Sequence, residues 1–282
     1  MARPFSATNA KRIIKRHQNI IEKLNNVVSS VEKYRTKAKE ASDALVAQEV
    51  LKVLADIPIE EINRDKRGIR VKALRDYGYR TIADISTASV YSIASVHGIS
   101  EDAAYSIKSI VNDIVSKARQ GVKIRLSTDN RSREATALVL ALSQYCRSQK
   151  VADECRQLLN KNKQTIDYAV EDLNSSAGTL KWLLLSKTRK QKAAEAYNNL
   201  IDLIDGDYGR EAEIQISNAD VIDRSSNNDA WQDFATNSVR FFNDLEDINP
   251  GVLGNDDSMY GLPEDLAREV QEECFFPDGL LC

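Results

Sequence analysis

The sequence has few of the residues that metal centres and nucleophilic active sites require. Histidine occurs only twice, as His17 and His97, and no two cysteines form a Cys-x-x-Cys pair. A structural zinc site needs four clustered nitrogen or sulfur ligands, so we expect the protein to hold no zinc. We interpret the cysteines as reduced, partly buried thiols. They are Cys146, Cys155, Cys274 and Cys282.

The motifs of common nucleotide-binding and hydrolytic enzymes are also missing. There is no Gly-x-x-x-x-Gly-Lys-Ser/Thr, no Gly-x-Gly-x-x-Gly and no Gly-x-Ser-x-Gly. This argues against a P-loop ATPase, a dinucleotide-binding domain and an α/β-hydrolase. Two histidines leave no convincing catalytic triad, and the carboxylates are scattered rather than grouped around a metal. We therefore expect no cofactor and no catalytic residue in this chain.

Long apolar runs are absent as well. No stretch approaches the roughly 18–20 apolar residues that a membrane span needs. Residues 1–5 lack the apolar core of a signal peptide. We expect a cytoplasmic protein that does not bind membranes.

What the sequence has in abundance is charge at helical spacing. Charged residues make up 29% of the chain, aromatic residues only 6%, and only five prolines interrupt it. Apolar residues recur at three- and four-residue steps, which predicts an all-α protein. Composition divides the chain into a basic helical arm (1–56), a segment with a distinctive motif (57–121), a helical bundle (122–205) and an acidic, partly ordered, linker-like segment with short helices (206–282).

Helix boundaries follow from prolines, glycines and caps. Residues 6–55 are expected as one long helix or two consecutive ones that end before Pro58, and Gly121 marks another helix end. The bundle is predicted as four helices, and the acidic segment as a brief strand followed by helices. The predicted ranges are 131–147, 149–160, 163–174 and 178–204 in the bundle, a strand-like 214–216, a helix over 231–248 and a last short helix from Pro263.

The net charge of −3 conceals a strong asymmetry along the chain. Residues 206–282 contain 18 acidic residues and 4 arginines, a balance of −14, whereas residues 1–205 have a balance of +11. A basic body with an acidic end is typical of a nucleic-acid binder that carries a repelling or self-masking segment. We therefore expect that removing residues 206–282 raises the affinity for nucleic acid.

The most informative pattern lies at residues 93–107, which read Ile-Ala-Ser-Val-His-Gly-Ile-Ser-Glu-Asp-Ala-Ala-Tyr-Ser-Ile. Gly98 permits a strained turn. Ile99 fills the gap between two helices, and Ala104 lets them approach closely. The pattern resembles the consensus of the helix-hairpin-helix family of DNA-binding modules.

This resemblance implies that the hairpin and the next helix start present free backbone N–H groups, to which the helix dipole adds positive potential. Such an end holds an anion, which on DNA is a phosphate, so binding depends little on base sequence. Ser100 stands where the family usually has its second glycine and can cap the helix, whereas Glu101 and Asp102 repel phosphate. The expected contacts are His97, Gly98, Ile99, Ser100 and, on the following helix, Lys108.

A partner unit lies upstream. The run from Leu74 through Gly78-Tyr79-Arg80-Thr81-Ile82 resembles the tandem helix-hairpin-helix domains at the N-termini of archaeal-type recombinases. Two registers of its hairpin remain open, Asp65-Lys66-Arg67 or the glycine turn Gly68-Ile69-Arg70. Either one places the densest basic patch of the chain beside a helix start. The DNA contacts expected here are Arg64, Lys66, Arg67, Gly68, Arg70, Lys72 and Arg75.

A second resemblance concerns the whole chain. The order of basic arm, helix-hairpin-helix, helical bundle and acidic stretch is similar to the N-terminal region of some bacterial SWI/SNF-type DNA helicases. Residues 261–266 and 279–282 look like the lead-in to that family's first motor motif. The resemblance implies a non-catalytic accessory region that holds DNA for a motor beyond Cys282. The alternative function is a protein-interaction scaffold whose helical bundle binds a protein partner.

Overall fold

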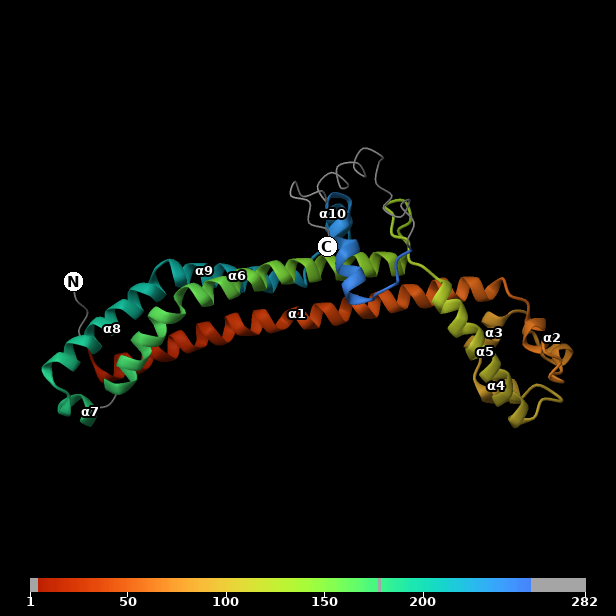
Figure 1. Cartoon of the computed structure of the whole chain (residues 1–282), viewed down its shortest axis with the longest axis horizontal. Coiled ribbons are helices and arrows are strands. Elements are labelled where there is room, and N and C mark those ends of the chain that lie inside the picture. Colours follow the sequence, from red (N-terminus) through yellow and green to blue (C-terminus); the bar gives the residue numbers. More distant parts are fainter. Residues whose placement is uncertain (1–4, 177–178, 255–282) are drawn as a thin grey trace, which may run out of the picture. The chain divides into compact units, whose positions relative to one another are not determined.

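The computed structural model of the chain describes residues 5–176 and 179–254. Within these residues it contains helices, loops and two isolated β-bridges, and no strand (Figure 1). This confirms the all-α prediction. The elements are α1 (Ala7–Ala55), the 3-10 helix η1 (Ile59–Asn63), α2 (Val71–Tyr77), α3 (Ile82–Thr87), α4 (Val90–Ala94), α5 (Glu101–Gly121), α6 (Arg133–Ser176), α7 (Thr179–Leu184), α8 (Lys187–Asp205), α9 (Asp207–Ile222) and α10 (Asn227–Ile248).

The chain forms two compact units, each built from segments that are distant in sequence. The first unit holds residues 1–37 and 140–230, and the second holds residues 38–139 and 231–282. Helices α1, α6 and α10 each pass from one unit into the other.

The first unit is held together by an apolar seam between α1, α6 and α8. Phe5 extends this seam, because its ring stacks on Trp182 with 4.1 Å between ring centroids and meets Tyr197 edge-on. The turn from α8 into α9 is tight, and a side chain at Gly209 would collide with the carbonyl oxygen of Ile204. The buried residues of the seam are Ala10, Ile13, Ile14, Ala169, Leu173, Ala196, Tyr197, Leu200, Ile201 and Ile204.

In the second unit, α3, α4 and η1 contact α5, and α2 packs on η1 (Figure 1). Thr81 and Asp84 form a capping box at the start of α3, in which the Asp84 carboxylate accepts the backbone N–H groups of Arg80 and Thr81 at 2.7 and 2.9 Å. These hydrogen bonds lower the pKa of Asp84. The buried core here is almost entirely aliphatic: Ile59, Ile62, Leu74, Ile82, Ile85, Ile93 and Ile107.

The second unit also contains an aromatic cluster on α10. The buried ring of Phe234 meets Trp231, Phe241 and Phe242 edge-on, at centroid distances of 5.6, 5.5 and 5.8 Å. Helix α10 is interrupted at Asn237, whose φ of −133° and ψ of 30° are not helical. Residues 231–248 are helical as predicted, except for this interruption at Asn237, and their aromatic side chains are buried.

Three secondary-structure predictions were wrong. The helix predicted over 178–204 is divided into α7 and α8, because the Ser186 side chain caps the start of α8. The bundle does not break near residues 148 and 161–162, because α6 runs unbroken from Arg133 to Ser176. Residues 214–216 are not strand-like but lie inside α9. The arm is one helix that ends before Pro58, and Gly121 ends α5, as predicted. The helix predicted from Pro263 lies outside the described residues.

No helix among the described residues combines the length and the apolar run that crossing a bilayer requires.

Candidate nucleic-acid interface

The segment that carries the hairpin pattern forms two helices joined by a tight turn. Helix α4 ends at Ala94 and α5 begins at Glu101. Between them Gly98 has a φ of 86°, in the left-handed region that favours glycine. Ile99 is buried, and the Ser100 hydroxyl accepts the backbone N–H of Ala103 at 3.2 Å. The turn therefore has the geometry that its sequence predicts, with serine as the cap.

The upstream loop repeats this arrangement between η1 and α2. Gly68 has a φ of 75° and, with Ile69 and Arg70, directly precedes α2, just as Gly98, Ile99 and Ser100 precede α5. Ile69 is half-buried, and its N–H donates to the Asn63 side chain at 3.3 Å. Of the two registers left open by the sequence, the structure has the glycine turn at the helix start. Lys66 lies earlier in the loop, also with a positive φ of 53°.

The upstream turn at residues 68–70 (the first turn) and the turn at residues 98–100 (the second turn) lie against each other. A Cβ atom built on Gly98 would stand 2.7 Å from Nη1 of Arg70, so the Arg70 guanidinium lies on the backbone of the second turn. At the other end of α2, the Tyr77 hydroxyl is 3.3 Å from Oγ of Ser95. Helix α2 therefore runs along the second turn, with a cation at its start and an aromatic ring at its end. This contact was not predicted from the sequence.

The predicted cations fall into two groups. Lys66, Arg70 and Lys72 are exposed. The other three arginines form ion pairs with nearby carboxylates: Arg64 with Glu61 at 2.8 Å, Arg67 with Asp65 at 2.8 Å, and Arg75 with Glu60. The side chains of these three arginines are more than half exposed, and exposed pairs contribute only about 0–1 kcal/mol. Such pairs can exchange a carboxylate for a phosphate at little cost.

Lys108 has a different place. Its ammonium donates to the carbonyl oxygens of Ile85 and Ser86, at 3.2 and 2.9 Å, and so satisfies the C-terminal end of α3. His97 is exposed in the second turn, and so are Glu101 and Asp102 in the first turn of α5. Two carboxylates thus lie beside the second turn, and the exposed cation that contacts this turn is Arg70.

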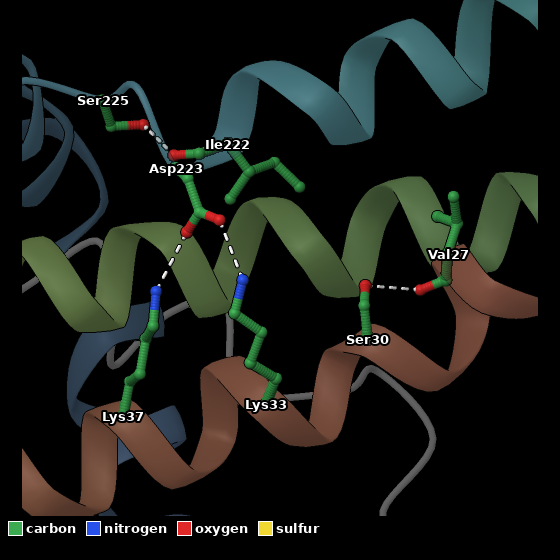
Figure 2. Close-up of polar contacts among 7 residues, drawn as sticks. All are labelled: Val27, Ser30, Lys33, Lys37, Ile222, Asp223 and Ser225. Carbon is green, nitrogen blue, oxygen red and sulfur yellow. Dashed lines mark hydrogen bonds and ion pairs between the residues drawn. The ribbon is translucent and has the colours of Figure 1, made fainter.

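A separate charged cluster lies in the first unit, where the chain after α9 meets α1 (Figure 2). The Asp223 carboxylate binds the ammonium groups of Lys33 and Lys37 at 2.8 and 2.9 Å. Both ammonium groups also lie about 5 Å from the centroid of the Tyr34 ring. The hydrogen bond from Lys33, and then that from Lys37, holds the pKa of Asp223 below its usual value. Here a residue of the acidic segment neutralises two cations of the basic arm.

The two described cysteines, Cys146 and Cys155, are both buried. Burial raises the pKa of Cys155 to about 11, so its thiol is protonated and unreactive at neutral pH. In the described part of the chain, no group of three or more His, Cys, Asp and Glu side chains could hold a metal ion.

Comparison of the chain with family models, with curated proteins and with solved structures finds no match in any of the three.

Proposed function

We propose that the chain binds DNA without sequence preference, through phosphate contacts at its two adjacent turns. The observation that carries this proposal is the position of Arg70, whose guanidinium lies on the backbone of the second turn at Gly98. A phosphate placed there meets a guanidinium, which suits its geometry, and the backbone at the start of the 21-residue helix α5. These groups read the backbone of DNA and not the base edges.

The surrounding charges support the same function. Lys66 and Lys72 are exposed near Arg70 in the sequence and offer further phosphate contacts. The ion pairs of Arg64, Arg67 and Arg75 are exposed and therefore exchangeable. Each phosphate neutralised releases condensed counterions, which makes binding strongly dependent on salt.

We propose further that the chain serves as the non-catalytic N-terminal region of an ATP-dependent DNA helicase or translocase. The support is the order of segments and the resemblance of residues 261–266 and 279–282 to the lead-in of a motor domain. These residues lie outside the described part of the chain. A Walker motif encoded downstream of Cys282 would support this larger assignment, and a stop codon there would count against it.

The test of DNA binding compares two arginines of the second unit. Arg70→Gln removes the cation at the paired turns, and Arg125→Gln removes another exposed cation outside them. Fluorescence anisotropy with a labelled duplex is measured for the full chain over a range of salt concentrations. The wild type should show a steep log–log salt dependence, and Arg70→Gln should reduce the slope by about 0.9, the value for one phosphate contact.

Arg125→Gln should leave both the affinity and the slope unchanged, and circular dichroism should confirm that both variants are folded. An affinity that does not depend on salt, or equal losses in the two variants, would contradict the proposal.

One observation favours the alternative, a protein-interaction scaffold. Leu183 and Leu184 of α7 in the first unit are 71% and 87% exposed. Two adjacent exposed leucines suit a contact with another protein. If this is the main function, changing both leucines to serine should abolish capture of a protein partner, and Arg70→Gln should have no effect on it.

A further inference from the structure

Exposed tyrosines are concentrated around the second turn. Tyr77 ends α2, Tyr91 lies in α4 and Tyr105 lies near the start of α5. These three tyrosines are 55%, 85% and 58% exposed. Among the described residues, the only other exposed tyrosine is Tyr168, in the first unit. Large exposed rings therefore gather where the phosphate contacts are proposed.

The stacked rings of Tyr77 and Tyr79, together with the exposed Tyr91 of α4, are called the aromatic surface. The rings of Tyr77 and Tyr79 stack with 5.6 Å between centroids and an angle of 30°. The Tyr77 hydroxyl reaches Ser95, and the backbone N–H of Ser95 bonds to the carbonyl of Tyr91. Residues four apart share a helix face, so Tyr91 lies on the side of α4 that Tyr77 approaches.

The aromatic surface and the phosphate site lie along the same turn. Arg70 reaches Gly98 from the start of α2, and Tyr77 reaches Ser95 from its end. Helix α2 has seven residues and is about 10 Å long. One strand can therefore contact the guanidinium and the rings together.

Paired and unpaired DNA offer different groups to such a surface. In a duplex the faces of the bases are covered by their neighbours, and only the backbone and the base edges are accessible. In an unpaired strand the base faces are free to stack on aromatic side chains, and the phosphates remain available to cations. A fully paired ligand would use Arg70 but leave the tyrosine rings in water.

We propose that the aromatic surface stacks on unpaired bases, so that the preferred ligand is DNA in which a duplex borders an unpaired strand. This inference rests on the proposed function, because Arg70 must hold the phosphates of the same strand. Tyr91 is the main stacking residue, since it is the most exposed of the three.

The experiment uses the full chain and two labelled ligands, a blunt duplex and the same duplex with an unpaired tail. Wild type should bind the tailed duplex more tightly. Tyr91→Ala should weaken binding of the tailed duplex at least about fivefold and leave the blunt duplex unchanged. Tyr91→Phe keeps the ring and should retain the preference. Tyr168→Ala is the matched control, because it removes an exposed tyrosine from the first unit.

Stacking itself is read from a fluorescent aminopurine placed in the tail. Wild type, Tyr91→Phe and Tyr168→Ala should quench it, and Tyr91→Ala should not. Equal affinity for the two ligands without quenching would overturn this inference and leave the proposed function intact. No salt-dependent binding of either ligand would overturn both. Quenching that persists in Tyr91→Ala would exclude Tyr91 as the stacking residue and so contradict the proposal.

Discussion

The contact between Arg70 and Gly98 gives a quantitative prediction. Alanine at Gly98 has two consequences, one for the backbone and one for Arg70. The φ of 86° is unfavourable for a residue with a Cβ by about 1–2 kcal/mol. The new methyl group would also stand 2.7 Å from Nη1 of Arg70. Because a guanidinium at the end of a flexible side chain can move away, the second consequence should be a displaced cation rather than further loss of stability.

Gly78 offers the matched control. It ends α2 with a φ of 119°, and a Cβ there would meet no atom within 4 Å. Gly78→Ala and Gly98→Ala should therefore lower the free energy of unfolding by similar amounts, about 1–2 kcal/mol. Only Gly98→Ala should weaken DNA binding, by about tenfold, because a charge-assisted hydrogen bond contributes about 1.5 kcal/mol or more. Chemical denaturation followed by circular dichroism gives the first quantity, and anisotropy titration with duplex DNA gives the second.

A double-mutant cycle decides whether Arg70 transmits the effect. In the Arg70→Gln background, Gly98→Ala should cause little further loss of affinity, because the cation that it displaces is already absent. Additive losses of affinity would refute this reasoning, since the alanine would then act on the turn itself and not through Arg70. Equal losses of affinity in the two alanine variants would refute it as well.

Three further predictions concern stability and charge. His17 is buried without a hydrogen-bond partner for either ring nitrogen, and burial lowers its pKa. Because the unfolded state then binds the proton more readily than the folded state, the free energy of unfolding should fall as the pH falls below about 6.5. His17→Leu should flatten that part of the pH profile of stability. Asp84→Ala removes the capping box of α3 and should cost about 1 kcal/mol in denaturant titrations at pH 7. Because the folded-state pKa of Asp84 lies below its usual value, this difference from wild type should shrink in acid, as the pH falls through that pKa. Asp223→Asn releases Lys33 and Lys37 and should raise DNA affinity at low salt. The control is Asp220→Asn, which makes the same change at a neighbouring residue without these ion pairs and should have a smaller effect on affinity.

Local features of the fold were predictable because they depend on a few adjacent residues. Pro58 sets the end of α1 and Gly121 the end of α5. Gly98 has the positive φ that a tight turn requires. The choice between two registers of the first turn was not predictable, because Lys66 and Gly68 both adopt positive φ and only the start of α2 shows which one matches the second turn.

Helix α6 is continuous across the breaks predicted near residues 148 and 161–162 because the polar side chains there bond within the helix. Ser148 is buried, and its hydroxyl donates to the carbonyl of Tyr145 at 2.7 Å. The side-chain amide of Asn162 donates to the carbonyl of Leu158 at 2.9 Å. Each polar group is satisfied by the preceding turn of the same helix, so neither interrupts it. The strand-like pattern at 214–216 is similarly misleading, because Ile214 is 55% exposed on a helix whose buried side includes Ala212 and Ile222.

The acidic segment shows why charge alone was an incomplete guide. Its balance of −14 suggested a separable polyanion, whose removal would leave a basic body free to bind DNA. The same residues bury Tyr208 in the first unit and Trp231, Phe234 and Phe241 in the second. Cutting the chain at residue 206 would therefore remove core side chains from both units together with the charge. A change of affinity in such a truncation would report unfolding as much as electrostatics. Since the described carboxylates lie on α9 and α10 or directly beside them, their effect on DNA binding can be isolated only by substitutions that keep these helices and remove single charges, as Asp223→Asn does.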